Sequence, residues 1–146
     1  MAQTGQRVDP FRNFNFLVEI DGIAQASFTE CSGLSTTTEV IEHRQGGDNV
    51  RVRKLPGKTS YSDISLKWGL TDSTELWDWR QQITDGNIVR KNGSIVVFDL
   101  ANSTEVARWN FFQAWPSKWD GPALNAKGND ISIETLVLAV ERLQRA

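Results

Sequence analysis

The sequence has few of the residues from which reactive and metal-binding sites are usually built. Its 146 residues include one cysteine, Cys31, and one histidine, His43. A lone cysteine cannot form a disulfide within the chain, and a structural zinc site needs four ligands, mostly cysteine and histidine. No nucleophile motif surrounds His43. We therefore expect no metal, no cofactor and no catalytic residue, and we predict that the protein is not an enzyme. Cys31 is either a small buried side chain on a strand or a reactive thiol.

The chain also lacks an excess of charge of either sign and any long apolar run. Its 16 basic and 18 acidic residues give a net charge of −2, so charge gives no reason to expect nucleic-acid or membrane-surface binding. No run approaches the ~20 apolar residues that a transmembrane helix needs. Residues 1–10 contain no apolar core of a signal peptide. We expect a protein made in the cytoplasm, without a membrane anchor.

One apparent nucleotide-binding signal fails on inspection. Gly57-Lys58-Thr59 resembles the end of a phosphate-binding loop, but that motif needs a glycine where this chain has Val52. The segment that follows is also predicted to be a strand, whereas the motif requires a helix. Nucleotide binding is therefore not expected.

The length and patterning predict one β-rich domain over residues 1–146, with residues 1–9 as a polar lead-in. Alternation of apolar and polar residues over 64–68, and over 14–20 apart from Leu17, indicates half-buried strands. Dipeptides that favour turns, such as Asp21-Gly22, Pro56-Gly57 and Asn92-Gly93, separate the strands. The expected strands cover residues 14–20, 23–31, 35–44, 50–55, 64–68, 94–100, 105–115 and 131–143, with a loop over 116–129.

One helix is expected after the strand that ends at Trp68. Asp72 with Glu75 three residues later suggests a capping box, and Gly86 suggests the C-terminal end. Leu76 and Trp79 fall on one side at helical spacing. The fold class that follows is mainly β, with two packed antiparallel sheets in a barrel-like sandwich and one α-helix.

The order and spacing of several segments resemble the contractile-phage tail tube family. The resemblance covers residues 9–143, and its segments are Asp9-Pro10-Phe11-Arg12, 15–22, 28–34, 38–42, 46–49, Leu55-Pro56-Gly57-Lys58, 66–69, 75–79 and 109–116. The family comprises the inner tubes of phage tails and of extracellular contractile injection systems. The residues alone do not distinguish these two.

The resemblance implies a structural subunit that forms hexameric rings, stacked into a tube. The implied partners are other copies of the chain, a surrounding sheath protein, baseplate or spike hub and terminator proteins, and a payload of effector protein or DNA in the lumen. An alternative within the family is a paralogue that adapts the tube to the baseplate. An alternative from another class is a carbohydrate-binding β-sandwich that uses exposed tryptophans.

Two sets of residues are candidates for these roles. The inter-ring or inter-subunit contact candidates are Gly46, Gly47, Asp48, Asn49, Arg51, Arg53, Lys54, Leu55, Pro56, Gly57, Lys58 and Trp77. The lumen-facing candidates are Thr36, Thr38, Glu42, Asp63, Ser65 and Lys67. Without the resemblance, the loop residues of the first set are better explained as a solvated hairpin tip, and the second set is equally well explained as an ordinary solvent face. Trp77 belongs to the expected helix, where it either meets a neighbour or is simply exposed.

Overall fold

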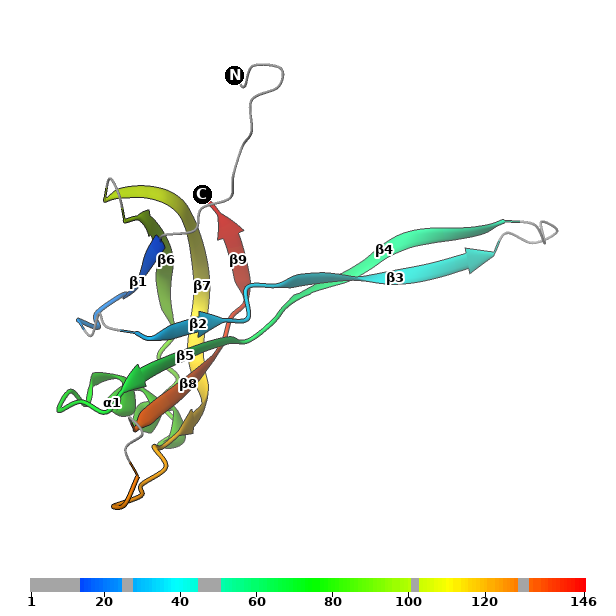
Figure 1. Ribbon diagram of the computed structural model, residues 1–146. Coiled ribbons are helices and arrows are strands. Elements are labelled where there is room, and N and C mark those ends of the chain that lie inside the picture. The colour runs from blue at the N-terminus through cyan, green and yellow to red at the C-terminus, as the bar shows by residue number, and fades with distance from the viewer. Residues whose placement is uncertain (1–13, 25–27, 45–50, 101–102, 129–131) are drawn as a thin grey trace.

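The structure is a computed structural model that describes residues 14–24, 28–44, 51–100, 103–128 and 132–146. The predicted lead-in 1–9 lies outside these ranges. Within them the chain forms nine strands and one helix (Figure 1). The strands are β1 (Phe14–Ile20), β2 (Glu30–Ser32), β3 (Thr36–Arg44), β4 (Val52–Tyr61), β5 (Ile64–Gly69), β6 (Lys91–Asp99), β7 (Thr104–Asp120), β8 (Ile133–Ala139) and β9 (Arg142–Arg145), and the helix is α1 (Glu75–Thr84).

The 17-residue strand β7 joins two antiparallel layers of sheet. Its first part pairs with β6 and β9, and its last part, from Trp115, pairs with β8. Gln113, with φ of 55°, lies where β7 exchanges one partner for the other. The first layer is therefore β1-β6-β7-β9 and the second is β2-β5-β8-β7. This arrangement confirms the predicted fold class.

The core lies between these layers and is closed at one end by α1. Ile64, Leu66, Leu136 and Leu138, on β5 and β8, are completely buried, as is Phe111 on β7. The alternation of the sequence explains this, because every second side chain of a strand points to the same face. The inward residues of β5 were predicted correctly from that pattern.

The helix packs on the second half of β7 through its predicted apolar side. Leu76 and Trp79 are buried, and the indole Nε1 of Trp79 donates to the carbonyl of Val89 at 2.7 Å. The Arg80 guanidinium donates to the carbonyl of Pro116 at 3.1 Å. These bonds hold α1 against the body of the protein.

Strands β3 and β4 form a separate two-stranded hairpin that projects far from the body (Figure 1). It continues the β2–β5 pair, since β3 follows β2 and β4 precedes β5 in the chain. Nearly all of its side chains are exposed, and only Gly57 and Tyr61 are partly covered. The hairpin therefore has no core of its own.

The first strand pairs with a distant part of the chain instead of the segment that follows it. Residues 23–31 were expected to return beside β1, but β1 pairs with β6 along its whole length. Among the described residues of this segment, the bridge between Ile20 and Ile23 is what remains of the expected hairpin, and β2 covers residues 30–32. The turn at Asp21-Gly22 is present, with Gly22 at φ of 77°.

Two expected turns lie inside strands, where each accompanies an irregularity in pairing. Gly93 belongs to β6, where its backbone lies against the ring of Phe111 so closely that a side chain would not fit. Pro56 and Gly57 belong to β4, beside a bulge opposite Thr38 and Val40. Glycine and proline are tolerated in strands at bulges and free edges, so these residues shape strands here rather than end them.

The last part of the chain was predicted with wrong boundaries. Strand β7 continues through Pro116, and the single strand expected over 131–143 is two strands, β8 and β9. The break falls at Val140 and Glu141, where the chain passes from the second layer to the first. Residue 131 is outside the described ranges.

The helix begins without the predicted capping box. Thr74 is the N-cap residue and makes no side-chain cap hydrogen bond. Glu75 instead accepts a hydrogen bond at 2.7 Å from the backbone N–H of Ala24, which ties the helix to the turn after β1. The predicted stop at Gly86 is confirmed by its φ of 90° after the last helical turn.

Candidate assembly interface

The hairpin exposes large apolar side chains on both of its faces. Ile41 lies directly opposite Leu55, and Val40 lies opposite Pro56 on the other face. Val40 is 60% exposed, Ile41 46% and Leu55 44%. A ribbon of two strands is marginally stable by itself, and exposed apolar side chains on strands are a template for association. The hairpin is therefore the strongest candidate for an assembly contact.

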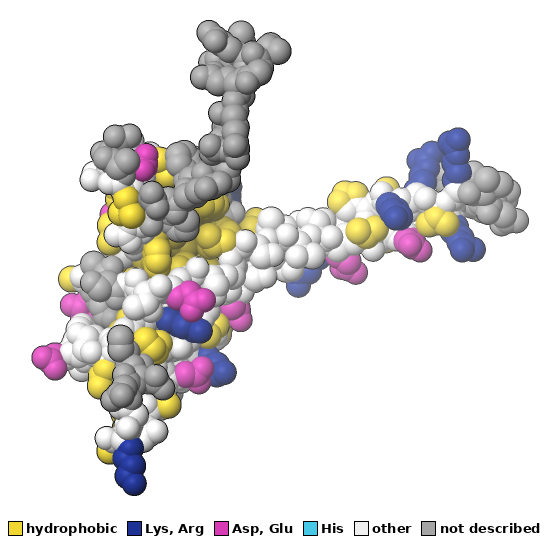
Figure 2. All heavy atoms as spheres, in the orientation of Figure 1, with side chains coloured by type: hydrophobic (Ala, Val, Ile, Leu, Met, Phe, Trp, Pro, Cys, Tyr) yellow, Lys and Arg dark blue, Asp and Glu magenta, His cyan; other side chains and the backbone are white. Residues whose placement is uncertain are grey.

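Basic residues gather toward the outer end of the hairpin. Arg44, Arg51, Arg53 and Lys54 lie on or beside the outer parts of β3 and β4, and Figure 2 shows their basic side chains grouped there. Residues 46–49, also predicted to make contacts, lie outside the described residues. The remaining predicted contact residues of this region, Leu55 to Lys58, belong to β4.

Trp77 is not part of this surface. It lies on α1, at the opposite side of the body from the hairpin's outer end (Figure 1). Its side chain is 42% exposed and makes an edge-to-face contact with Trp119, with ring centroids 4.6 Å apart. The Nε1 of Trp119 is buried with no hydrogen-bond partner among the described residues. The two tryptophans form a second, aromatic surface beside the helix.

A polar face covers the outside of the second layer. Ser65 and Lys67 point outward from β5, because Ile64, Leu66 and Trp68 point into the core. Lys67 pairs with Glu30 of β2 at 3.2 Å. On β7, which pairs with β8, the Lys118 Nζ lies 3.5 Å from a carboxylate oxygen of Asp120. Among the described residues, two acids and two bases of this face thus form internal pairs, and Asp63 lies exposed at its edge.

The six predicted lumen residues fall into two groups. Ser65 and Lys67 belong to the polar face of the body, and Asp63 lies exposed just before them. Thr36, Thr38 and Glu42 lie on the hairpin, where the hydroxyl oxygens of Thr38 and Thr59 are hydrogen-bonded at 2.9 Å. Their exposure to a lumen stays a prediction.

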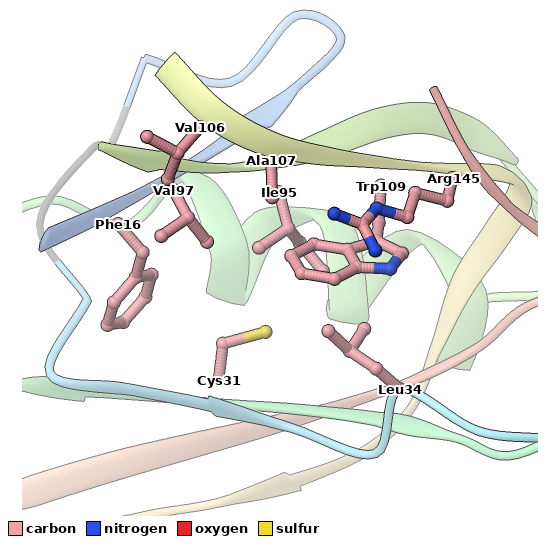
Figure 3. Close-up of a pocket in the computed structure, with 9 residues that line it drawn as sticks. All are labelled: Phe16, Cys31, Leu34, Ile95, Val97, Val106, Ala107, Trp109 and Arg145. Atoms are coloured by element: carbon pink, nitrogen blue, oxygen red, sulfur yellow. The ribbon is translucent and has the colours of Figure 1, made fainter. Parts of the chain in front are cut away.

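An apolar pocket of about 410 Å³ opens between the first layer and β2, and sequence patterning missed it. Figure 3 shows the Cys31 and Leu34 side chains facing residues of β1, β6 and β7 across it. The lining residues are Phe16, Cys31, Leu34, Ile95, Val97, Val106, Ala107, Trp109 and Arg145. The alternation of apolar residues identified which side of each strand points inward. It did not show how far the opposite layer extends over that side.

Cys31 lies in this pocket and its chemistry favours the structural interpretation. Burial, and then the charge of Glu30, raise the pKa of its thiol to about 11. The thiolate is the reactive form, so this cysteine is protonated and weakly nucleophilic near neutral pH. Among the described residues, no cluster of histidine, cysteine, aspartate and glutamate could hold a metal ion. In the same part of the chain, no helix has the length and apolar character to cross a membrane.

The family model of the T4-like virus tail tube protein gp19 matches residues 12–144. The chain belongs to this family. The match spans the hairpin, both layers and the helix, and it confirms the resemblance drawn from the sequence. A comparison with curated protein sequences finds no match.

Solved structures of contractile injection systems contain chains similar to the whole of this tail tube family member. A chain in the PVC sheath–tube complex of an extracellular contractile injection system is 26% identical, with a TM-score of 0.80 over 98% of this chain and 93% of that chain. A chain in the PVC sheath/tube terminator is 27% identical, with a TM-score of 0.82 over 98% and 99%. A chain in the anti-feeding prophage baseplate is 27% identical, with a TM-score of 0.78 over 96% and 97%.

More distant structures share the fold alone. Hcp1 from Flavobacterium johnsoniae is 16% identical, with a TM-score of 0.56 over 90% of this chain and 94% of that chain. The family is that of a tail tube protein, and one of the similar chains comes from a sheath–tube complex. The predicted class of function, a tail tube protein, is therefore confirmed.

Proposed function

We propose that this chain is the inner-tube subunit of a contractile tail or injection particle, with six copies in each ring and rings stacked into a tube. The observation that carries the proposal is the projecting hairpin, which exposes apolar side chains on both faces far from its own core. A monomer gains nothing from these side chains in water, whereas a second copy can bury them. The contact is heterologous, since the hairpin of one copy meets a different surface of the next.

The strand edges support assembly into a closed ring. In the described part of the chain, β1, β2 and β9 are the end strands of the large sheet, and the hairpin strands pair only with each other. Each such edge presents unpaired backbone N–H and carbonyl groups. Pairing across subunit boundaries closes the sheets into one barrel and satisfies these groups.

The polar face of the second layer suits the wall of a conduit. Most of its charges are paired and cancel, Glu30 with Lys67 and Lys118 with Asp120. A strongly basic wall would retain DNA through its phosphates, and an unpaired charged wall would retain proteins of opposite charge. A neutral, polar wall allows an effector protein or DNA to pass through the lumen.

The outside of the tube would face a sheath, and its ends would meet hub and terminator proteins. The similar chains come from structures whose names include a sheath–tube complex, a sheath/tube terminator and a baseplate. We assign Trp77, which forms an exposed aromatic surface with Trp119, to contact with a neighbouring protein. The particle is a phage tail or an extracellular injection system.

A second candidate function is the adaptor that joins the tube to the baseplate, which the match within a baseplate structure favours. A main tube subunit should stack into tubes many rings long. An adaptor should stop at one ring, because its two ring faces meet different partners.

Electron microscopy of the purified full chain tests the proposal. We expect hollow rings of six subunits, alone or in stacks, with analytical ultracentrifugation reporting the same mass. Monomers at the highest attainable concentration would contradict tube assembly. Monomers that also bind a glycan array would instead identify a carbohydrate-binding module.

A further inference from the structure

The first layer lacks part of its covering, and the pocket marks the uncovered part. The second layer covers Ile95 and Phe111, but it leaves Val97, Ala107 and Trp109 facing the open pocket (Figure 3). A sheet with an apolar face needs a second layer against it. Figure 2 shows the apolar side chains gathered in this hollow beside the base of the hairpin.

We propose that this pocket receives Ile41 and Leu55 from the hairpin of a second copy of the chain. The inference rests on the proposed ring assembly and specifies where its central contact lies. The chain's own hairpin begins just beyond Leu34, at the rim of the pocket, and projects away from it (Figure 1). The hairpin of its own chain does not cover the pocket, and we assign the cover to the hairpin of a neighbour.

Size and chemistry fit this occupant. The volume of about 410 Å³ lies within the range of roughly 300–1,000 Å³ over which pockets enclose a ligand. Ile41 and Leu55 lie opposite each other and form one continuous apolar pair. On the other face, Val40 lies opposite Pro56, which is a smaller apolar pair, and the register of Glu42 and Lys54 separates it from Val52.

Charges on the two surfaces run in complementary order. By strand alternation, Glu39 and His43 share the face of Ile41, and Arg53 lies opposite His43. Along this face of the hairpin, an acidic residue is therefore followed by the apolar pair and then by a basic residue. The series spans ~13 Å, at ~3.3 Å per residue. Arg145 lies at one end of the pocket, where its guanidinium carbon is 5.5 Å from the centroid of the Trp109 ring.

Asp99 lies beyond the residues that line the pocket, on the side away from Arg145. It follows Val97 on the same face of β6, four residues from Ile95, which pairs with Trp109, and it is thus ~13 Å along the strand from that pair. When the hairpin lies along the pocket in this direction, the side chain of Glu39 can contact Arg145 while that of Arg53 contacts Asp99. The opposite orientation of the hairpin would place like charges together at both ends.

The native cysteine makes a direct test available. The variant Ile41→Cys contains two cysteines, one in the pocket and one on the hairpin. Oxidation with copper phenanthroline joins the two thiols, with release of two protons and transfer of two electrons to copper(II). Since the pKa of Cys31 is about 11, the exposed new thiol supplies the thiolate near pH 8. A disulfide also requires the two Cα atoms to lie within ~7 Å.

We expect a ladder of covalent oligomers on a non-reducing gel, which collapses to monomer after reduction. Cys31→Ser combined with Ile41→Cys should abolish the ladder. Val40→Cys, on the opposite face of the ribbon, is the matched control and should leave mainly monomer. A ladder from Val40→Cys with none from Ile41→Cys would overturn the proposed contact.

Microscopy of the same samples before oxidation separates the two proposals. Rings that form without a ladder would overturn the pocket contact and leave the tube function intact. An absence of rings from the unsubstituted chain, imaged alongside, would overturn both. Phe11→Cys tests whether residues 1–13 of the same chain fill the pocket instead, and a compact, covalently closed monomer from that variant would overturn the inference.

Charge exchange provides an independent test that needs no cysteine. Glu39→Arg and Arg145→Glu should each weaken ring formation at least tenfold in the concentration required, and the double variant should restore it. Circular dichroism establishes that each variant is folded. Failure of the double variant to assemble better than either single variant would count against the pairing.

Discussion

The body and the hairpin use similar residues under opposite conditions. In the body, Ile64 and Leu66 are completely buried between two layers. In the hairpin, Ile41 and Leu55 have the same chemistry but are 46% and 44% exposed. The body can be stable as a single chain because its apolar residues already have partners. The hairpin's apolar residues contribute only when another molecule covers them, so the two regions should respond differently to the same substitution.

The sharpest contrast comes from truncating the core, which should cause the largest loss of subunit stability. Phe111→Ala should cost about 3–5 kcal/mol of unfolding free energy, since it removes a completely buried ring between the layers. Urea denaturation of a dilute, monomeric sample measures the loss. Phe112→Ala, next in sequence and only partly buried against Arg142, should cost clearly less. Equal losses would mean that the layers do not pack as described.

A smaller loss is expected from adding one methyl group inside β6. Gly93→Ala should cost about 1–3 kcal/mol, because the new Cβ meets the Phe111 ring and the backbone of Glu19. The adjacent Ser94→Ala removes only the hydroxyl's hydrogen bond to Asn110, at 2.6 Å, and should cost about 1 kcal/mol. Thermal unfolding of both variants compares them. A neutral Gly93→Ala would argue that β6 does not run against Phe111.

The ion pair on the polar face should contribute less again. A double-mutant cycle with Glu30→Gln and Lys67→Met should give a coupling of about 0.2–1 kcal/mol, because both side chains are substantially exposed. The coupling should shrink between 50 mM and 1 M salt as the charges are screened. A coupling that salt leaves unchanged would indicate a buried pair instead.

The hairpin should show the smallest change in subunit stability and the clearest change in assembly. Leu55→Ala should alter the unfolding free energy of the monomer by less than about 0.5 kcal/mol, while it raises the concentration needed to form rings. Sedimentation velocity across a concentration series measures both species. Arg51→Ala, nearby but polar, is the matched control for the apolar contact. A large loss of monomer stability in Leu55→Ala would mean that the hairpin folds back on its own body.

Local patterning predicted the strands and helix where local preference and burial agree. Ile64, Leu66 and Trp68 alternate and are buried, and Leu76 and Trp79 lie on the inner side of α1. The same reasoning failed at Gly93 and Pro56, whose dipeptides favour turns but lie in strands. There, long-range pairing and the packing of Phe111 outweigh the local preference, and neither can be read from neighbouring residues.

The candidate site was predicted in part. The sequence pointed to residues 51–58 as a contact region, and the structure places these residues on or next to strand β4 of the hairpin. Sequence patterning provided no indication of the pocket around Cys31, because the residues that line this pocket come from five distant segments. Trp77, the contact candidate on the helix, lies beside Trp119 and away from the hairpin, and its contact with a neighbour stays a prediction.

The sequence alone determined that the chain is a β-rich tail tube protein with one helix, because alternation, helical spacing and family motifs are properties of local order. Only the tertiary structure decided that β1 pairs with β6, that β7 connects both layers and that the hairpin stands apart from the core. The physical reason is that strand pairing joins residues far apart in the chain, and the energy of burial depends on which face another element covers.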